Sequence, residues 1–126
     1  MFKPVSTDDA PAAIGPYSQA VDLGNLVFVS GQIPLDPTTM QFVSDDVEEQ
    51  THQVMKNLGA ILQEAGLSYQ NIVKASIFLD SMEDFAKVND IYASYLSEPY
   101  PARAAVEVSK LPKGAKVEVE AIAVRN

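Results

Sequence analysis

The amino-acid sequence predicts an α+β protein, a two-layer sandwich in which two helices cover one face of a mixed six-stranded sheet. Residues 47–65 and 85–96 repeat apolar residues at three- and four-residue spacing, which indicates amphipathic helices. Residues 71–80, 101–108 and 116–124 alternate with period two, which is typical of strands. Because each helix stands between strands, we expect it to carry the chain across one face of the sheet.

The composition restricts the chain to a few classes of protein. Its 126 residues are expected to form one domain, residues 1–126, and 47% hydrophobic residues are enough for a core. The sequence has no cysteine and a single histidine, His52, so it offers no thiol and no histidine-rich metal centre, and we expect no cofactor. The net charge of −8 argues against nucleic acid, whose phosphates bind lysine and arginine. With no apolar signal region or membrane-spanning run, we expect a cytoplasmic protein with no membrane partner.

The first part of the chain is expected to supply three short strands. Residues 2–6 are compatible with an edge strand, and residues 7–16 contain the Asp, Pro and Gly residues typical of a loop. Residues 18–23 and 26–29 flank a Gly-Asn turn signal, which indicates a hairpin.

Two turns in this region present polar groups. Residues 14–17 form a constrained turn that presents Tyr17. Ser30 and Gly31 follow the strand at 26–29, where the glycine allows close approach to a backbone and the serine offers a hydroxyl. The plain alternatives are that Tyr17 only packs over a core edge and that Ser30-Gly31 is only a turn.

The helix signals are strong in the middle of the chain. Acidic residues at 45, 46 and 48 suit the N-terminus of the first helix, and Gly66 is expected to end it. Its apolar stripe consists of Val47, Thr51, Val54, Leu58, Ile61, Leu62 and Ala65. The second helix starts after Ser81, and the prolines that follow residue 98 end it. Its buried stripe is predicted to consist of Phe85, Val88, Tyr92, Tyr95 and Leu96.

The faces of the later strands can also be predicted. The strand at 71–80 is apolar on much of both faces, as an internal strand would be. Its first face is predicted to carry Val73, Ala75, Ile77 and Leu79. In the last strand, Val117, Val119, Ala121 and Ala123 share one face, and Glu118 and Glu120 lie on the other.

The strand at 101–108 places Ala104, Val106 and Val108 opposite Arg103, Ala105 and Glu107. We expect the more apolar of these faces to pack on the helices. Arg103 would then share the open face with Glu118, and another copy of the chain would cover that face.

Several of these segments together resemble the RidA/YjgF family, the reactive intermediate deaminases. The matching segments are Ala12-Ala-Ile-Gly-Pro-Tyr17-Ser-Gln, Val29-Ser-Gly-Gln-Ile-Pro34, the strand at 73–78, Pro101-Ala-Arg103 and Val117-Glu-Val-Glu-Ala-Ile-Ala-Val124. They occur in the family's order and cover nearly the whole chain. The resemblance implies a chorismate-mutase-like fold and a homotrimer with clefts between subunits. It also implies cofactor-independent hydrolysis of 2-imino acids, formed from enamines, to 2-oxo acids and ammonia.

The resemblance assigns the catalytic roles to Arg103 and Glu118. Arg103 would hold the substrate carboxylate, and Glu118 would orient water. This assignment fits the chemistry, because a guanidinium can hold a carboxylate bidentately but cannot act as a base. A glutamate can act on water only within hydrogen-bond distance of it.

The resemblance also implies substrate-binding roles for Tyr17, Ser30 and Gly31. Asn89 corresponds to a helix asparagine that lines the cleft in some members. Many members carry a cysteine where this chain has Ala105, so only the backbone could act at that position.

Alternative interpretations of the same residues stay open. Arg103 could form an interface salt bridge with a glutamate that fixes the oligomer. The chain could also be a non-catalytic protein that binds small carboxylic acids, or a chaperone-like protein that uses the same cleft. A ribonuclease is disfavoured by the net charge and by the single histidine.

Overall fold

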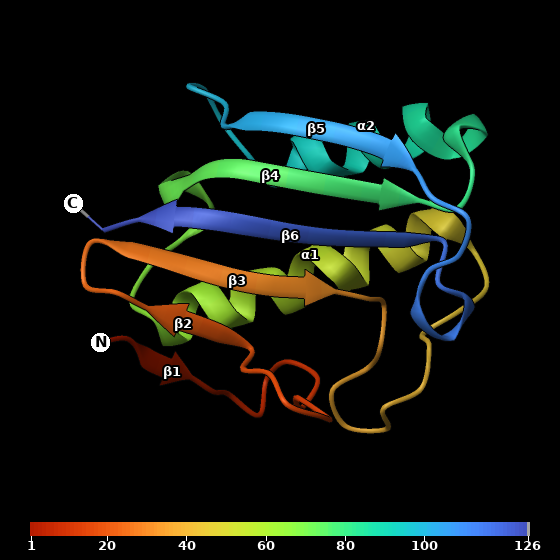
Figure 1. The fold of residues 1–126 in the computed structure, drawn as a ribbon. Helices are drawn as coiled ribbons and strands as arrows, with labels where there is room; N and C mark the ends of the chain where they lie inside the picture. Colours follow the sequence, from red (N-terminus) through yellow and green to blue (C-terminus); the bar gives the residue numbers. More distant parts are fainter. Residues whose placement is uncertain (126) are drawn as a thin grey trace.

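In the computed structural model, which describes residues 1–125, one mixed sheet is covered on one face by two α-helices (Figure 1). The strands are β1 (Lys3–Val5), β2 (Ala20–Asp22), β3 (Leu26–Gln32), β4 (Ile72–Leu79), β5 (Ala102–Glu107) and β6 (Val117–Val124). The helices are α1 (Val47–Glu64) and α2 (Phe85–Ser94), with short 3₁₀ turns η1 (Tyr69–Asn71), η2 (Met82–Asp84) and η3 (Pro112–Gly114). The predicted two-layer α+β architecture is confirmed.

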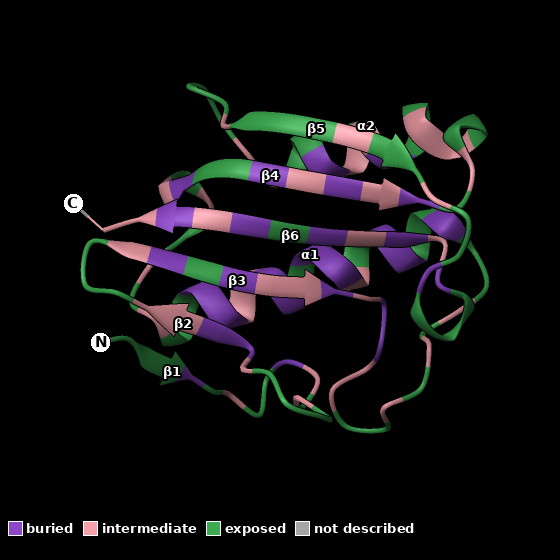
Figure 2. Cartoon of the chain, in the orientation of Figure 1, coloured by how far each residue is buried: buried purple, intermediate pink, exposed green. Residues whose placement is uncertain are grey.

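The last strand in the sequence lies inside the sheet. The strand order is β1-β2-β3-β6-β4-β5, so β6 pairs with β3 on one side and with β4 on the other. Among the strands of residues 1–125, only the β4–β5 pair is parallel, because α2 carries the chain back between these two strands. Figure 2 shows the alternation of burial along β6, whose odd-numbered residues enter the core while Glu118 and Glu120 face away from the helices.

The core lies between the sheet and α1. Asp46 caps this helix by accepting a hydrogen bond from the Glu49 N–H at 2.9 Å, and Gly66 follows its end at a φ of +78°. The predicted apolar stripe is confirmed, since Val54, Leu58, Ile61 and Leu62 are completely buried. Among residues 1–125, no helix is long and apolar enough to cross a membrane.

One detail of the β4 prediction was wrong. The structure buries Ile72 and leaves Val73 44% exposed, whereas Val73 was predicted to share a face with Ala75, Ile77 and Leu79. The ladder between β4 and β6 shifts between Ile72 and Lys74, and this irregularity reverses the alternation at the start of the strand. From Ala75 onward the predicted alternation holds.

The predicted orientation of β5 was also wrong. Arg103 is paired in register with the buried Ala75 and therefore lies on the helix side of the sheet. Ala105 packs partly buried against the core, and Val106 is 44% exposed on the open face. The error arose because β5 is an edge strand covered only by the short α2, so its helix side can accommodate a long polar side chain.

The loop before β2 is held by one buried amide. The Gln19 side chain is 4% exposed, accepts from the Thr7 N–H at 2.7 Å, and donates to the carbonyls of Thr7, Ala10 and Pro11 at 2.8–3.3 Å. These bonds fix the loop that leads to Tyr17.

The loop after β3 is held in the same way from α1. The fully buried Asn57 donates from Nδ2 to the carbonyls of Ile33 and Leu35 at 3.2 and 3.0 Å. Both loops therefore depend on a side-chain amide inside the protein rather than on strand pairing.

We predict that Gln19→Glu lowers the free energy of unfolding by roughly 1–3 kcal/mol. The carboxylate has nearly the same shape, but it cannot donate to three carbonyl groups that already point at it. Urea denaturation at a fixed protein concentration measures the change. Gln41→Glu, at an exposed position, controls for the added charge, and equal losses in the two variants would contradict the prediction.

Candidate active site

A cleft of about 630 Å³ opens between the loop before β2, the end of β3 and the start of β6. Four of the seven predicted site residues line it, namely Tyr17, Ser30, Gly31 and Glu118. Tyr17 is 53% exposed, so its ring stands at the edge of the cleft and not in the core. The structure thus brings these four residues together, whereas Arg103 and Asn89 lie elsewhere.

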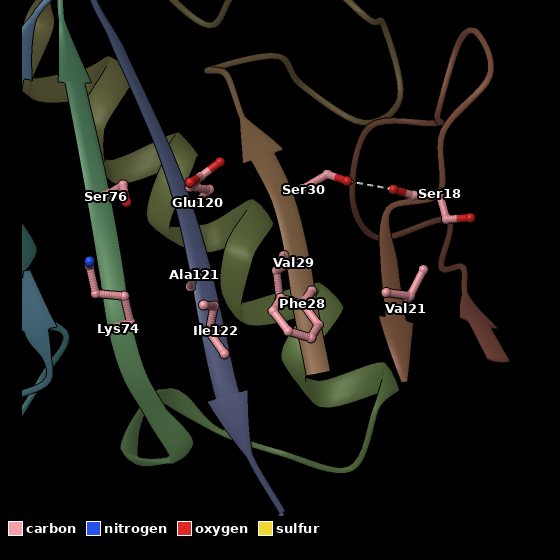
Figure 3. A pocket seen from close by; sticks show the side chains of 10 residues that line it. All are labelled: Ser18, Val21, Phe28, Val29, Ser30, Lys74, Ser76, Glu120, Ala121 and Ile122. Atoms are coloured by element: carbon pink, nitrogen blue, oxygen red, sulfur yellow. Dashed lines mark hydrogen bonds between the residues drawn. The ribbon is translucent and has the colours of Figure 1, made fainter. Parts of the chain in front are cut away.

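An irregularity in β3 forms one wall of this cleft. The register with β6 shifts between Val29 and Gln32, so Ser30 and Gly31 together lie opposite Glu120. The Ser30 hydroxyl donates to the Ser18 carbonyl at 2.6 Å (Figure 3), which leaves its oxygen available only as an acceptor. The predicted turn at Ser30-Gly31 is therefore a bulge inside a longer strand.

Gly31 is required here for a steric reason. A Cβ added at this position would lie 2.9 Å from the Glu118 Cδ and closer still to its Oε2. The carboxylate of Glu118 therefore rests directly against the glycine backbone. Any larger residue would force the Glu118 side chain to move.

Glu118 is a half-buried carboxylate with no stabilising partner. Among residues 1–125 its side chain has neither a hydrogen-bond donor nor an ion-pair partner. Burial raises the pKa of Glu118, and the negative charge of Glu120 raises it further. A group of this kind can exchange a proton more readily near neutral pH than an ordinary surface glutamate can.

The open face of the sheet carries a second hollow beside this cleft. It has a volume of about 280 Å³ and shares Ser30 and Glu120 with the cleft. Figure 3 shows Phe28, Ile122 and Lys74 projecting from neighbouring strands on this face. Phe28 is 40% exposed, so the face combines uncovered apolar groups with charged ones.

Arg103 lies in a different cavity, on the helix side of the edge strand. That cavity measures about 440 Å³ and is lined by Asn89, Tyr92, Ala93, Tyr100, Pro101 and Arg103. Arg103 Nη1 donates to Asn89 Oδ1 at 2.5 Å. Its Cζ lies 5.4 Å from the centre of the Phe85 ring and 5.3 Å from that of Tyr92.

The predicted catalytic pair is thus divided within one chain. Arg103 and Glu118 lie on opposite faces of the sheet and line different cavities. The expectation that they share the open face is corrected by the orientation of β5. Ala105 lines neither cavity and can offer only its backbone.

Sequence reasoning missed the two aromatic neighbours of Arg103. Phe85 and Tyr92 were predicted only as buried residues of the second helix. The available signal was their spacing around Asn89, because positions i, i+4 and i+7 lie on one face of a helix. Within residues 1–125, no group of three or more His, Cys, Asp or Glu side chains is placed to hold a metal ion.

Comparison with known proteins defines the class to which this fold and these clefts belong. The protein-family model described as Endoribonuclease L-PSP matches residues 7–125, and the chain belongs to this family, the RidA/YjgF family. The resemblance found in the sequence is confirmed. The 2-iminobutanoate/2-iminopropanoate deaminase of Salmonella typhimurium is 50% identical over 128 residues, covering 99% of each chain.

Solved structures agree with this membership. A protein from Thermotoga maritima superposes with a TM-score of 0.97 at 49% identity, covering 100% of this chain and 99% of that chain. TdcF from E. coli, solved with bound serine, has a TM-score of 0.94 at 46% identity, covering 98% and 99%.

We predict that Glu118→Gln raises the thermal unfolding midpoint at neutral pH. Because the pKa of Glu118 is raised in the folded chain, ionisation of this carboxyl favours the unfolded state. The difference between variant and wild type should vanish below the ordinary glutamate pKa of 4.5 and grow as the pH rises through the folded pKa. Thermal unfolding from pH 4 to pH 8 measures it.

Glu64→Gln, at an exposed position, controls for removing one negative charge from a chain of net charge −8. A Glu118→Gln variant that is no more stable than wild type at any pH would show that Glu118 is not a strained site residue.

Proposed function

We propose that the protein is a cofactor-independent hydrolase that converts reactive 2-imino acids, the tautomers of enamines, into 2-oxo acids and ammonia. Its membership of the family and its 50% identity to a 2-iminobutanoate/2-iminopropanoate deaminase support this activity. The observation that carries the proposal is a pair of charges with no ion-pair partner among residues 1–125. They are the Arg103 guanidinium and the Glu118 carboxylate, each at the wall of a cavity.

Arg103 would recognise the substrate through its carboxylate. The guanidinium has five N–H donors, and the hydrogen bond to Asn89 uses one of its two terminal nitrogens. A fork of N–H groups therefore stays available for a bidentate contact. Such a contact fixes the imine carbon relative to the other cleft residues, and orientation of this kind is a main source of rate acceleration.

Glu118 would handle the protons of the reaction. In its ionised form it takes a proton from the attacking water, and a new C–O bond forms at the imine carbon. The protonated carboxyl then returns that proton to nitrogen, which gives a carbinolamine. Glu118 next takes the carbinolamine hydroxyl proton and passes it to the nitrogen, so the C–N bond breaks and ammonia leaves as the carbonyl forms. The raised pKa of Glu118 suits both steps, because one group must act first as base and then as acid.

Tyr17 and Ser30 would complete the binding wall. The Tyr17 hydroxyl stands at the edge of the cleft and can donate to a polar substrate atom. The Ser30 oxygen, whose proton is committed to Ser18, can accept from the imine or amine nitrogen. Gly31 contributes by leaving room for the Glu118 carboxylate.

The complete site would form between two copies of the chain in a homotrimer. One copy would supply Arg103 and Asn89, and its neighbour would supply Glu118, Tyr17 and Ser30. The division of these residues between two faces of one chain supports this arrangement. The uncovered apolar residues of the open face, including Phe28 and Val106, also favour contact with another copy.

A binding protein without catalysis is the second candidate, because TdcF was solved with bound serine, an amino acid and not an imine. We propose no nucleic-acid partner, since 17 acidic against 9 basic residues oppose phosphate binding. We also propose a cytoplasmic location and no membrane partner. An amino-acid oxidase that generates 2-iminobutanoate in the assay separates the candidates. Formation of 2-oxobutanoate faster than spontaneous hydrolysis identifies the enzyme, and an unchanged rate would refute it.

We predict that two inactive variants restore activity when they are combined. Arg103→Ala and Glu118→Gln should each lower kcat/KM by roughly a hundredfold or more. In a cyclic trimer with shared sites, every mixed trimer regains one intact site, so random 1:1 assembly should recover about a quarter of wild-type activity. Co-expression with two different affinity tags supplies the mixed trimers for assay.

The double variant mixed with wild type is the matched control for subunit dilution. Recovery in the first mixture would be absent if Arg103 and Glu118 acted within the same chain. That result would refute the shared site while leaving the deaminase activity itself to the assay above.

We predict that Gly31→Ala lowers kcat/KM by roughly 10- to 100-fold, because displacement of a catalytic group by about 1 Å has an effect of this size. The added methyl group must push the Glu118 carboxylate away. The unfolding midpoint should change little, since a flexible side chain can yield. Gly59→Ala, whose Cβ would meet Tyr69 and no residue of the cleft lining, serves as control and should keep wild-type kcat/KM.

A further inference from the structure

Three side chains on one face of α2 contact the Arg103 guanidinium. Phe85, Asn89 and Tyr92 stand at positions i, i+4 and i+7, so they lie in a row along this face. Asn89 accepts a hydrogen bond from Nη1 at 2.5 Å, and the two rings lie 5.4 and 5.3 Å from Cζ. We call these three residues the arginine cradle.

The arginine cradle contains no negative charge. The chain has 17 acidic residues, yet among residues 1–125 the only salt bridge joins Arg125 to Asp22, and none involves Arg103. The cradle offers an amide oxygen and the faces of two aromatic rings, which attract a cation without neutralising it. Arg103 is therefore held in place with its full charge available.

An aspartate in place of Asn89 would have the opposite effect. Its carboxylate has the same reach and would bind the guanidinium more strongly, as a charge-assisted pair. It would then compete with a ligand carboxylate for the same fork and repel that ligand. The neutral amide is thus the acceptor that orients the arginine and leaves its charge for another molecule.

Tyr92 contributes its ring and not its hydroxyl. Its side chain is 5% exposed, and in the part of the chain that is described its hydroxyl oxygen has no hydrogen-bond partner. An unpaired buried hydroxyl opposes folding, so the hydroxyl is not there for stability. Tyr92 therefore acts on Arg103 through the face of its aromatic ring.

We propose that Phe85, Asn89 and Tyr92 are positioning residues that orient the Arg103 guanidinium without neutralising it, and that this neutrality makes the cavity select carboxylate ligands. The inference rests on the proposed function, because it assumes that Arg103 meets the carboxylate of a 2-imino or 2-oxo acid. It goes further in assigning the selectivity to three α2 side chains that act through Arg103.

The test measures binding of 2-oxobutanoate by titration calorimetry, which needs no turnover, together with KM and kcat for the imine generated in the assay. Asn89→Asp should weaken 2-oxobutanoate binding more than tenfold and raise KM similarly, with kcat and the unfolding midpoint nearly unchanged. Asn89→Ala should weaken binding less, because it loosens the guanidinium but adds no competing charge.

A purely structural role for Asn89 predicts the reverse order. Asp keeps the hydrogen bond to Arg103 and would then be harmless, while Ala would be the worse variant. Ala86→Asp, at an exposed position of the same helix, controls for an added negative charge and should bind normally. Binding by Asn89→Asp that equals or exceeds wild type would overturn the proposal.

Variants of Tyr92 provide an independent test of the proposal. Tyr92→Phe keeps the ring and should bind 2-oxobutanoate as wild type does, whereas Tyr92→Leu should weaken binding severalfold. Equal weakening by both would overturn the role of the ring. If 2-oxobutanoate binds as expected but no imine is hydrolysed, the proposed activity fails and the cradle stands. If the wild type does not bind 2-oxobutanoate, the assignment of Arg103 as a carboxylate site fails, and the cradle fails with it.

Discussion

The burial of one side of β6 is the constraint on which the rest of the structure depends. This strand lies between β3 and β4, and its Val117, Val119, Ala121 and Ala123 are at most 4% exposed beneath the helices. A shift of one residue would place Glu118 and Glu120 in that core, and burying two carboxylates among apolar side chains is costly. Hydrophobic burial therefore fixes the register, and the register delivers the Glu118 carboxylate to the backbone of Gly31.

The irregular parts of the protein are built around that fixed strand. Ser30 and Gly31 together oppose Glu120, so the bulge widens β3 at the point where the cleft opens. The loops before β2 and after β3 form few strand-pairing hydrogen bonds of their own. Gln19 and Asn57 hold them from inside the protein, so buried side-chain amides fix the loops at the mouth of the cleft.

Much of the fold could be predicted from the sequence, because an element buried on one side has a periodic pattern of apolar residues. The two faces of β6 and the apolar stripe of α1 are strongly periodic, and both were correctly predicted. The faces of β5 were not, because the more apolar face, with Ala104 and Val106, was expected on the helices, whereas the structure places Arg103 and Ala105 there. What decides the orientation is α2, whose Phe85 and Tyr92 provide surfaces on which an arginine can lie. That contact depends on two elements meeting in space, which periodicity within one strand cannot show.

The position of Ile72 illustrates the same limit on a smaller scale. The sequence from Ile72 to Leu79 is apolar at both ends, so either alternation was reasonable for its first residues. The shift in the ladder with β6 is a property of the pair of strands and not of either one. Likewise, the separation of Arg103 from Glu118 could be recognised only when the orientations of β5 and β6 were known. The sequence motifs around these two residues do not show which face of the sheet each side chain occupies.

The electrostatics of the whole chain explain why the unpaired state of Arg103 matters. A net charge of −8 repels any anionic ligand at long range, although salt limits this repulsion to about 8–10 Å under physiological conditions. Attraction must therefore come from a local cation, and a cation already paired with one of the 17 acidic residues would supply none. Neutral neighbours such as Asn89 and Tyr92 keep that attraction intact. Glu118 presents the complementary case, since burial and the neighbouring charge of Glu120 raise the pKa of its carboxyl, as the proposed proton transfer requires. Among residues 1–125 neither Arg103 nor Glu118 has an ion-pair partner that would stabilise its charge, and the proposed chemistry depends on that absence.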